Sequence, residues 1–366
     1  MDVSRIKVSG LKCFNGPREV DLDLARPDGT AAGWTVLAGP NGSGKTTLLQ
    51  AVALALGAHP AVPAERWLAA GSPAGAVELN GGAAWRITRT GDAAPRAERT
   101  GPLSARHRYF GPGARPAPAT IHGPAAALVE DGLLPDGWRL EPPGPAGQGA
   151  GDLDGPGAGD RDGPWVRRAG LALPLAELGD GIARLAALVA DLATLTRRTR
   201  PEVVDGRPTL PVRATVLIDD IDLHLHPAWQ QRVGGWLTTH FPQVQFIVAT
   251  HSPYVCQAAD PGALIRLAGP EEEAVPPRLL GEDLHQRVLY GSGDDTALSE
   301  LFGLASAYSA NAEAERRLLV RLERKLYAGD ASAAELAEYR ELGAKLNSSL
   351  TARADEATAR LLGRDR

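Results

Sequence analysis

Residues 39–47 read GPNGSGKTT and match the pattern G-x-x-x-x-G-K-[ST] in full. The glycines let backbone N–H groups curl around an anion, and a helix start behind the loop adds positive potential. An apolar run at 34–38 precedes the loop and another at 48–56 follows it, which is the order strand, loop, helix. The sequence therefore predicts a phosphate-binding loop made of Gly39, Pro40, Asn41, Gly42, Ser43, Gly44, Lys45, Thr46 and Thr47.

Two side chains of this loop have further predicted roles. Lys45 is placed to reach the β and γ phosphates of a nucleotide, and Thr46 to put its hydroxyl on Mg²⁺. A loop of this kind needs a second acid for the metal, and Asp219 stands at the end of the apolar run 215–218. We therefore expect ATP and Mg²⁺ as cofactors, with Thr46 and Asp219 as the metal-binding residues.

The segment LIDDIDLHLHP, residues 217–227, raises two further questions. Asp220 is either a catalytic residue or simply a second acid at the strand end. Asp222, His224 and His226 alternate and could share one face, and imidazole with carboxylate suits zinc. A single segment supplies only three such ligands, with no obvious fourth, so a positioning role is the alternative to a metal site.

The bulk composition is that of an ordinary globular protein. Hydrophobic residues make up 43% and charged residues 23% of the 366 residues. The net charge of −5 is not that of a dedicated nucleic-acid-binding protein, which is typically basic. A local basic patch is compatible with this net charge. The two cysteines make no disulfide framework, and we see neither a signal core nor an apolar run of membrane-spanning length. We expect a cytoplasmic protein without a membrane partner.

The order of elements predicts an α/β fold with a mixed N-terminal sheet, a central parallel sheet and a helical C-terminal region. The parallel sheet follows from a strand, helix and strand in succession after residue 213. The expected elements are strands within 4–24, a hairpin at 76–89, a helix at 181–196, a strand at 214–219, a helix at 228–240, a strand at 244–250 and helices over 311–362.

The middle of the chain differs from its flanks. Residues 141–164 contain 13 Gly or Pro among 24 residues. The few apolar side chains in this stretch cannot bury enough surface to offset the entropy lost on ordering it. We expect a poorly ordered insert at 111–164 within a nucleotide-binding head at 1–305. A helical extension is expected at 306–366, where a cluster of arginines is either a partner surface or a solvated face.

The order of the motifs is similar to that of the ATP-binding-cassette ATPases. The phosphate loop is followed by Leu178-Gly179-Asp180-Gly181 opening a helix, then by LIDDID, and then by FIVATHSP with His251. The chain more narrowly resembles the soluble branch that includes RecF, SMC and OLD-type proteins. The segments IDLHLHPAWQQ and FPQVQFIVATHSP look most like AAA-type ATPases of anti-phage defence, such as those of the Septu and PARIS systems.

The resemblance implies an ATP-dependent homodimer with ATP held between two heads. One head contributes the phosphate loop, and the other contributes Gly179, Asp180 and Gly181 as a signature loop. Asp220 then corresponds to the general base and His251 to a switch histidine at the γ-phosphate or the attacking water. His224 and His226 fall where a loop crosses the dimer interface, which makes them interface and positioning residues.

Three departures from the family pattern bear on the rate of hydrolysis. Gly179 stands where the signature usually has serine, and Asp220 stands where the general base is usually glutamate. The family's Q-loop glutamine has no visible counterpart, and the segment Tyr109-Phe110-Gly111 at that place offers no matching side chain. A shift of about 1 Å in a catalytic group can cost about 10²-fold in rate, so slow hydrolysis is expected.

Three functions remain open at this point. The first is an ATPase that regulates a separate effector, such as a nuclease, in an anti-phage defence or toxin-like system. The second is a RecF- or SMC-like ATPase of DNA repair or chromosome maintenance, which leaves DNA open as a partner. The nucleotide-binding subunit of a transporter ranks last, since the Q-loop glutamine that faces a membrane subunit is missing. Phe14 is expected either to stack on the adenine or to pack in the core.

Overall fold

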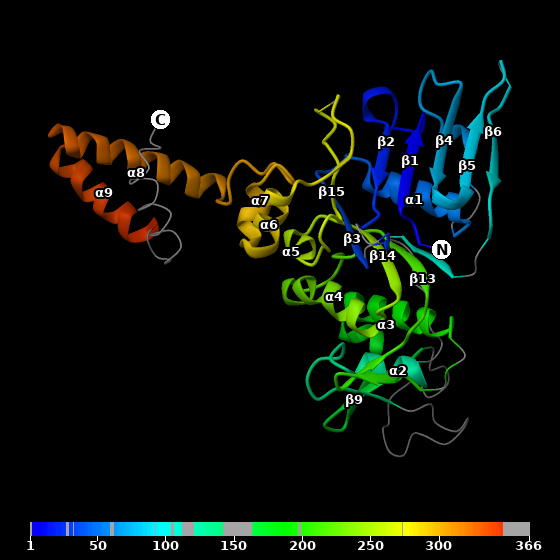
Figure 1. Cartoon of the computed structure of the whole chain (residues 1–366). Helices are drawn as coiled ribbons and strands as arrows, with labels where there is room; N and C mark the ends of the chain where they lie inside the picture. The colour runs from blue at the N-terminus through cyan, green and yellow to red at the C-terminus, as the bar shows by residue number, and fades with distance from the viewer. Residues whose placement is uncertain are drawn as a thin grey trace, which may run out of the picture. The chain divides into compact units, whose positions relative to one another are not determined.

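The structure, a computed structural model, is shown in Figure 1. It describes residues 2–26, 29–31, 33–58, 62–91, 93–103, 106–111, 121–141, 163–196, 198, 200–272 and 274–346. The chain divides into two compact units, Met1–Gly303 and Leu304–Arg366. None of the described helices is long and apolar enough to cross a lipid bilayer.

A six-stranded sheet with the order β16-β15-β3-β14-β13-β7 forms the centre of the first unit (Figure 1). Its strands are β3 at Trp34–Ala38, β7 at His107–Phe110, β13 at Ala214–Ile218, β14 at Val244–Thr250, β15 at Leu264–Arg266 and β16 at Arg278–Leu279. All neighbours pair in parallel except β15 and β16. Helix α4, Pro227–His240, connects β13 to β14, which confirms the predicted parallel β-α-β unit.

A second, antiparallel sheet has the strand order β2-β1-β4-β5-β6. Its strands are β1 at Arg5–Ser9, β2 at Val20–Asp23, β4 at Ala74–Leu79, β5 at Ala84–Thr88 and β6 at Arg96–Thr100. The hairpin predicted at 76–89 is β4 and β5, joined by the 3₁₀ turn Asn80–Gly82. The strands predicted within 4–24 are β1 and β2, which pair with each other.

Helix α1, Lys45–Leu56, packs against strands of both sheets and is apolar over most of its surface. This is the pattern of a helix buried on all sides. Successive side chains of a strand point to opposite faces, so Leu37 and Leu217 pack in the cluster around α1. Val36 and Val216 belong to the core on the other face. Strands β3 and β13 are mostly apolar because both faces of this parallel sheet are buried.

The other face of the central sheet is covered by helices that include α2, Pro124–Glu130, and α3, Asp180–Ala193. The expectation of a poorly ordered insert over 111–164 is wrong for residues 121–141. Leu128 and Leu133 in this stretch are fully buried in the core, because the run AALVEDGLL carries enough apolar surface to pack. The Gly/Pro content that motivated the prediction begins only after residue 141, and residues 112–120 and 142–162 lie outside the described part of the chain.

Several smaller elements complete the first unit. They are the 3₁₀ turns Gly16–Arg18, Ala64–Arg66 and Leu175–Leu178, the strands β8 at Arg139–Leu140, β9 at Trp165–Arg168, β10 at Leu171–Pro174, β11 at Glu202–Val204 and β12 at Arg207–Thr209, and the helices α5 at Pro253–Cys256, α6 at Glu282–Tyr290 and α7 at Gly293–Leu298.

The described part of the second unit is a pair of helices, α8 at Ala310–Ala328 and α9 at Ala333–Leu346. Ser332 and Glu335 cap the start of α9, since each side chain accepts a hydrogen bond from the other's backbone N–H. Leu319 and Leu322 are the buried residues of α8. The predicted helix beyond residue 346 lies outside the described residues.

Candidate nucleotide-binding site

The predicted site residues come from strands that end at the same edge of the central sheet. Strand β14 lies between β3 and β13, with Thr250 opposite Ala38 and Val248 opposite Ile218. The loop at 39–47 follows β3, Asp219 follows β13, and His251 follows β14. Carboxyl ends of parallel strands are where open α/β sheets bind their ligands.

The phosphate loop has a backbone that only glycine adopts at low cost. Gly39 has φ 154°, and a Cβ there would lie 2.2 Å from the carbonyl oxygen of Leu267. Gly44 has φ 100°, and a Cβ there would lie 2.8 Å from the ring of Phe14. Phe14 is fully buried against this loop, so core packing is the correct alternative and stacking on adenine is not.

Lys45 lies folded over its own loop. Its Nζ donates to the carbonyl oxygens of Gly39, at 2.9 Å, and Pro40, at 3.1 Å. Burial lowers the pKa of Lys45 to about 8, although the nearby charges of Asp220 and Asp219 act in the opposite direction. The ammonium group is therefore held inside the loop, next to the carboxylates that follow β13.

Thr46 and Asp219 meet although 173 residues separate them in the chain. The Thr46 hydroxyl donates to Oδ1 of Asp219 at 3.1 Å. Asp219 is fully buried, and burial, followed by the charge of Asp220, raises its pKa to about 6. A buried carboxylate beside a second carboxylate is stabilised by a cation, and hard oxygen donors are the ligands that Mg²⁺ prefers. These two residues therefore fit the predicted metal.

Tyr109 is a further side chain that contacts the predicted metal-binding residue Asp219. It lies on β7, beside β13, and its hydroxyl donates to Oδ2 of Asp219 at 3.4 Å. Gln50 of α1 also hydrogen-bonds this hydroxyl, and burial with the charge of Asp219 raises the pKa of Tyr109 to about 12. The segment 109–111 thus has no glutamine to match the family's Q-loop, but its tyrosine contacts the predicted metal-binding carboxylate.

Asp222 connects the loop after β13 to the end of β14. Its Oδ1 accepts hydrogen bonds from the Thr250 hydroxyl and, at 3.2 Å, from the backbone N–H of His251. Burial, followed by the charge of Lys45, lowers the pKa of His251 and favours the neutral imidazole. Asp222 thus has a positioning contact rather than a metal ligand's role in this structure.

Gln230 of α4 reinforces the same connection. Its Nε2 donates to the carbonyl oxygen of Leu225 at 3.0 Å, and its Oε1 accepts from the Ser252 hydroxyl at 2.7 Å. One amide therefore holds the loop after β13 and the residue after His251 together. An amide on the first turns of a helix is too common a pattern to indicate this.

The two histidines of the loop have different surroundings. His226 Nδ1 accepts from the N–H of Ala228 at 3.2 Å and so caps α4, whose first residue is Pro227. His224 has φ 63°, and its carbonyl oxygen would lie 2.5 Å from a Cβ on Gly181. Within the described residues, no group of three or more His, Cys, Asp or Glu side chains is placed to hold a metal ion. Asp220, with φ 48°, also has a left-handed backbone conformation, as His224 does.

The predicted signature residues begin α3 and contact the loop after β13. Gly179 has φ 133°, Asp180 is the first residue of α3, and Gly181 packs against the backbone of His224. Arg184, one turn further, donates to the carbonyl oxygens of Asp219 at 2.7 Å, Asp220 at 2.9 Å and Gly111 at 3.2 Å. These bonds fix the signature helix to the acid-bearing loop of its own chain.

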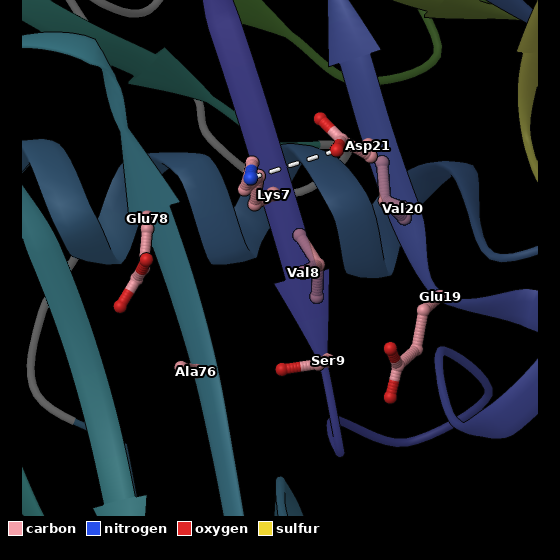
Figure 2. A pocket seen from close by; sticks show the side chains of 8 residues that line it. All are labelled: Lys7, Val8, Ser9, Glu19, Val20, Asp21, Ala76 and Glu78. Carbon is pink, nitrogen blue, oxygen red and sulfur yellow. Dashed lines mark ion pairs between the residues drawn. The ribbon is translucent and has the colours of Figure 1, made fainter.

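A separate hollow of about 320 Å³ lies on the solvent face of the antiparallel sheet (Figure 2). Figure 2 shows its polar lining residues, Lys7, Ser9, Glu19, Asp21 and Glu78, on and beside strands β1, β2 and β4. Lys7 and Asp21 pair at 3.6 Å across it. It contains none of the predicted nucleotide-binding residues.

Two segments of the chain match known families. Residues 5–82, which include the phosphate loop, match the family described as "AAA domain". Residues 163–257, which include the signature, Asp219 and His251, match the family described as "AAA domain, putative AbiEii toxin, Type IV TA system".

Curated relatives resemble part of the chain. It is 41% identical over 95 residues to the "Retron Ec83 probable ATPase" of Escherichia coli, which covers 26% of this chain and 17% of that protein. It is 34% identical over 99 residues to the "Septu protein PtuA" of Bacillus mycoides (strain KBAB4), which covers 27% of this chain and 13% of that protein. The matches thus span less than a fifth of each relative's length.

A solved SMC head, bound to the C-winged helix domain of ScpA, has the same fold. It superposes with a TM-score of 0.52 at 15% identity and covers 78% of this chain and 100% of that one. Likeness at this identity concerns the fold alone. It confirms the predicted α/β fold, and the two matched segments and the curated relatives confirm the resemblance to AAA-type ATPases that include retron and Septu proteins.

Proposed function

We propose that this chain, an ATPase of the AAA/ABC-like type related to anti-phage defence ATPases, binds Mg·ATP at residues 39–47 and hydrolyses it slowly in the cytoplasm. The observation that carries the proposal is the 3.1 Å hydrogen bond from Thr46 to Asp219 beside the buried Lys45. Two oxygen ligands for Mg²⁺ and the phosphate-binding lysine thus meet at one sheet edge.

Each residue of the site has a proposed task. The loop N–H groups and Lys45 bind the phosphates, while Thr46 and Asp219 hold Mg²⁺, which when bound neutralises charge on the phosphate oxygens. Asp220 accepts the proton of the attacking water, and His251 orients that water or the γ-phosphate. The carboxylate of Asp220 reaches one methylene less far than that of glutamate, which is the reason for slow turnover.

Two heads are proposed to close around ATP. Gly179, Asp180 and Gly181 of one chain would then face the nucleotide of the other, because a helix start offers unpaired N–H groups to an anion. The bonds of Arg184 to the carbonyls of Asp219 and Asp220 support this, since they give the signature helix a fixed place beside the acids. The closed dimer would regulate a separate effector such as a nuclease, and the PtuA and retron relatives support a defence role.

The test combines phosphate release with sizing. Wild type is expected to release phosphate slowly, Asp220→Asn to release none, and both to shift from monomer to dimer with Mg·ATP but not with Mg·ADP. Fast turnover that survives Asp220→Asn would remove Asp220 as the base. A mass that does not change with nucleotide would refute the ATP-dependent dimer, and a native pull-down would show whether a nuclease-like protein travels with it.

The alternative is an ATPase of DNA repair or chromosome maintenance, which rests on the resemblance of the motif order to RecF and SMC proteins. It requires DNA binding that strengthens with ATP and weakens steeply with salt, because phosphate contacts release counterions. A gel shift at two salt concentrations, with and without Mg·ATP, separates the two functions. Salt-sensitive, ATP-stimulated binding would favour repair, and its absence would favour the effector-regulating ATPase.

A further inference from the structure

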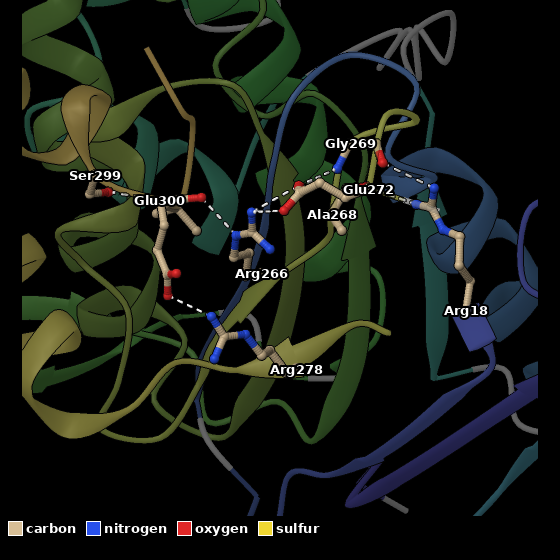
Figure 3. Close-up of polar contacts among 9 residues, drawn as sticks. Arg18, Arg266, Ala268, Gly269, Glu272, Arg278, Ser299 and Glu300 are labelled. Carbon is tan, nitrogen blue, oxygen red and sulfur yellow. Dashed lines mark hydrogen bonds and ion pairs between the residues drawn. The ribbon is translucent and has the colours of Figure 1, made fainter. Parts of the chain in front are cut away.

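Arg18 is a buried arginine that connects the back of the phosphate loop to the loop after β15. It ends the 3₁₀ turn before β2, and only 9% of its surface is exposed. Its Nη2 donates to the carbonyl oxygens of Ser43, at 3.2 Å, and Ala268, at 2.7 Å, while Nη1 donates to that of Gly269 at 3.1 Å. Figure 3 shows the guanidinium reaching the loop after β15.

Burying a guanidinium without a carboxylate is unusual, because a buried charge is normally paired. Among the described residues Arg18 forms no ion pair, and its Nε has no hydrogen-bond partner. Glu272, the acid nearest in sequence to Ala268 and Gly269, is bound by Arg266 at 2.7 and 2.8 Å and by the N–H of Gly269 at 3.0 Å (Figure 3). The hydrogen bond from Arg266 lowers the pKa of Glu272 most, and the charge of Arg18 helps to lower it. The hydrogen bonds of Arg18, however, go to backbone carbonyls of the phosphate loop and of the loop after β15.

The bond to Ser43 has a consequence on the other side of the same peptide. The carbonyl of Ser43 and the N–H of Gly44 belong to one planar trans peptide, so they point in opposite directions. Holding the carbonyl from behind therefore fixes where the N–H of Gly44 points. A charged donor on the carbonyl also polarises the peptide and makes that N–H a stronger donor.

The support on which Arg18 rests is itself rigid. Arg266 Nε donates to the carbonyl oxygen of Glu300 at 2.7 Å and its Nη2 holds Glu272, so the loop carrying Ala268 and Gly269 is fixed at both sides. A Cβ on Gly269 would lie 3.0 Å from Pro40, so this loop also packs on the phosphate loop. Arg18 therefore joins residue 43 to a fixed part of the sheet edge.

We infer that Arg18 is a positioning residue of the nucleotide site, holding the Ser43–Gly44 peptide so that its N–H faces the polyphosphate of a nucleoside di- or triphosphate. The inference rests on the proposed binding of nucleotide at residues 39–47. Arg18 touches no substrate in this role. It acts through the peptide, and its effect belongs to the phosphates rather than to the base.

The experiment is calorimetric titration of three ligands, namely Mg·ATP, Mg·ADP and inorganic pyrophosphate with Mg²⁺. Each is titrated into wild type, Arg18→Met, Arg18→Lys and the matched control Arg278→Met. Arg278 is a suitable control because it makes an exposed ion pair with Glu300. Arg18→Met is expected to weaken all three ligands by about tenfold or more, the size of a lost charged hydrogen bond. Arg18→Lys keeps the charge but loses the planar guanidinium with its several N–H donors, so a smaller loss of affinity is expected. Arg278→Met should bind as wild type does.

The stoichiometry of each titration gives the folded fraction, and the dissociation constant gives the affinity of that fraction. A merely structural role would lower the first and leave the second unchanged, which would overturn the inference. Arg18→Lys with wild-type affinity would also overturn it, because charge alone would then suffice. If Arg18→Met does not fold, Arg18→Lys decides the question. Wild type that binds no more tightly than Lys45→Ala would instead refute the proposed function, and the inference with it.

Discussion

The two halves of the candidate site are held in place in different ways. The phosphate loop takes its shape from its own glycines, with Gly39 and Gly44 in conformations that other residues avoid. The loop after β13 contains no glycine and has two non-glycine residues, Asp220 and His224, in the left-handed region. It is held there by side chains from elsewhere, such as Arg184 and Gln230. The phosphate loop therefore takes its shape mainly from its own glycines. The loop after β13 takes its shape mainly from contacts with residues distant in the sequence.

Substitution in the locally encoded half is expected to have the largest effect. Gly39→Ala would put a Cβ 2.2 Å from the carbonyl oxygen of Leu267 at φ 154°. The strained backbone and the steric overlap of this Cβ with the carbonyl oxygen should together lower the free energy of unfolding by about 2–5 kcal/mol. Gly71→Ala is the matched control, since Gly71 also has positive φ, at 76°, with nothing within 4 Å. Urea unfolding measures both, and equal losses would show that the fit to Leu267 is unimportant.

The remotely held half is tested by a double-mutant cycle on Asp222 and Thr250. Asp222→Ala removes the acceptor of the buried Thr250 hydroxyl, and Thr250→Val removes one donor to the half-buried Asp222 carboxylate, while the double variant removes both groups. We expect a coupling energy of about 1–3 kcal/mol in urea unfolding. The phosphate-release rate should fall in both single variants with little change in ATP affinity. Strictly additive effects would mean that the Asp222–Thr250 hydrogen bond does not hold the loop after β13 to the end of β14.

Gln230→Leu should have a smaller effect, confined to turnover. Loss of the amide frees Leu225 from Ser252, so kcat is expected to fall several-fold while KM stays near its wild-type value. Gln231→Ala is the control, because Gln231 is the exposed neighbour on the same helix. Steady-state phosphate release gives both constants. A fall in kcat of the same size for Gln231→Ala would show that α4, rather than the amide, matters.

Tyr109→Phe is expected to have the smallest effect, because its bond to Asp219 is long, at 3.4 Å. The variant should need a few-fold different Mg²⁺ concentration for half-maximal phosphate release, since one donor to the metal-binding carboxylate is gone. Titration of Mg²⁺ at saturating ATP measures this. An unchanged Mg²⁺ dependence would leave Tyr109 with a packing role only.

The sequence predicts the locally encoded parts well and the others poorly. The phosphate loop, the parallel β-α-β unit and the hairpin at 76–89 follow from glycine positions and apolar periodicity, which are local properties. The roles of Tyr109 and Gln230 could not be predicted in this way, because each depends on which strand or loop lies beside it. The ordered segment 121–141 was missed because Gly/Pro content after residue 141 was extended too far upstream.

The central claim is that Thr46 and Asp219 form one Mg·ATP site with Lys45, and a direct titration tests it. Mg·ATP would be titrated calorimetrically into wild type, Lys45→Ala and Asp219→Asn, each with Mg²⁺ and again with EDTA. We predict saturable binding by wild type that weakens with EDTA, loss of binding in Lys45→Ala, and binding in Asp219→Asn that no longer responds to EDTA. Equal binding by all three proteins, or none by wild type, would contradict the account.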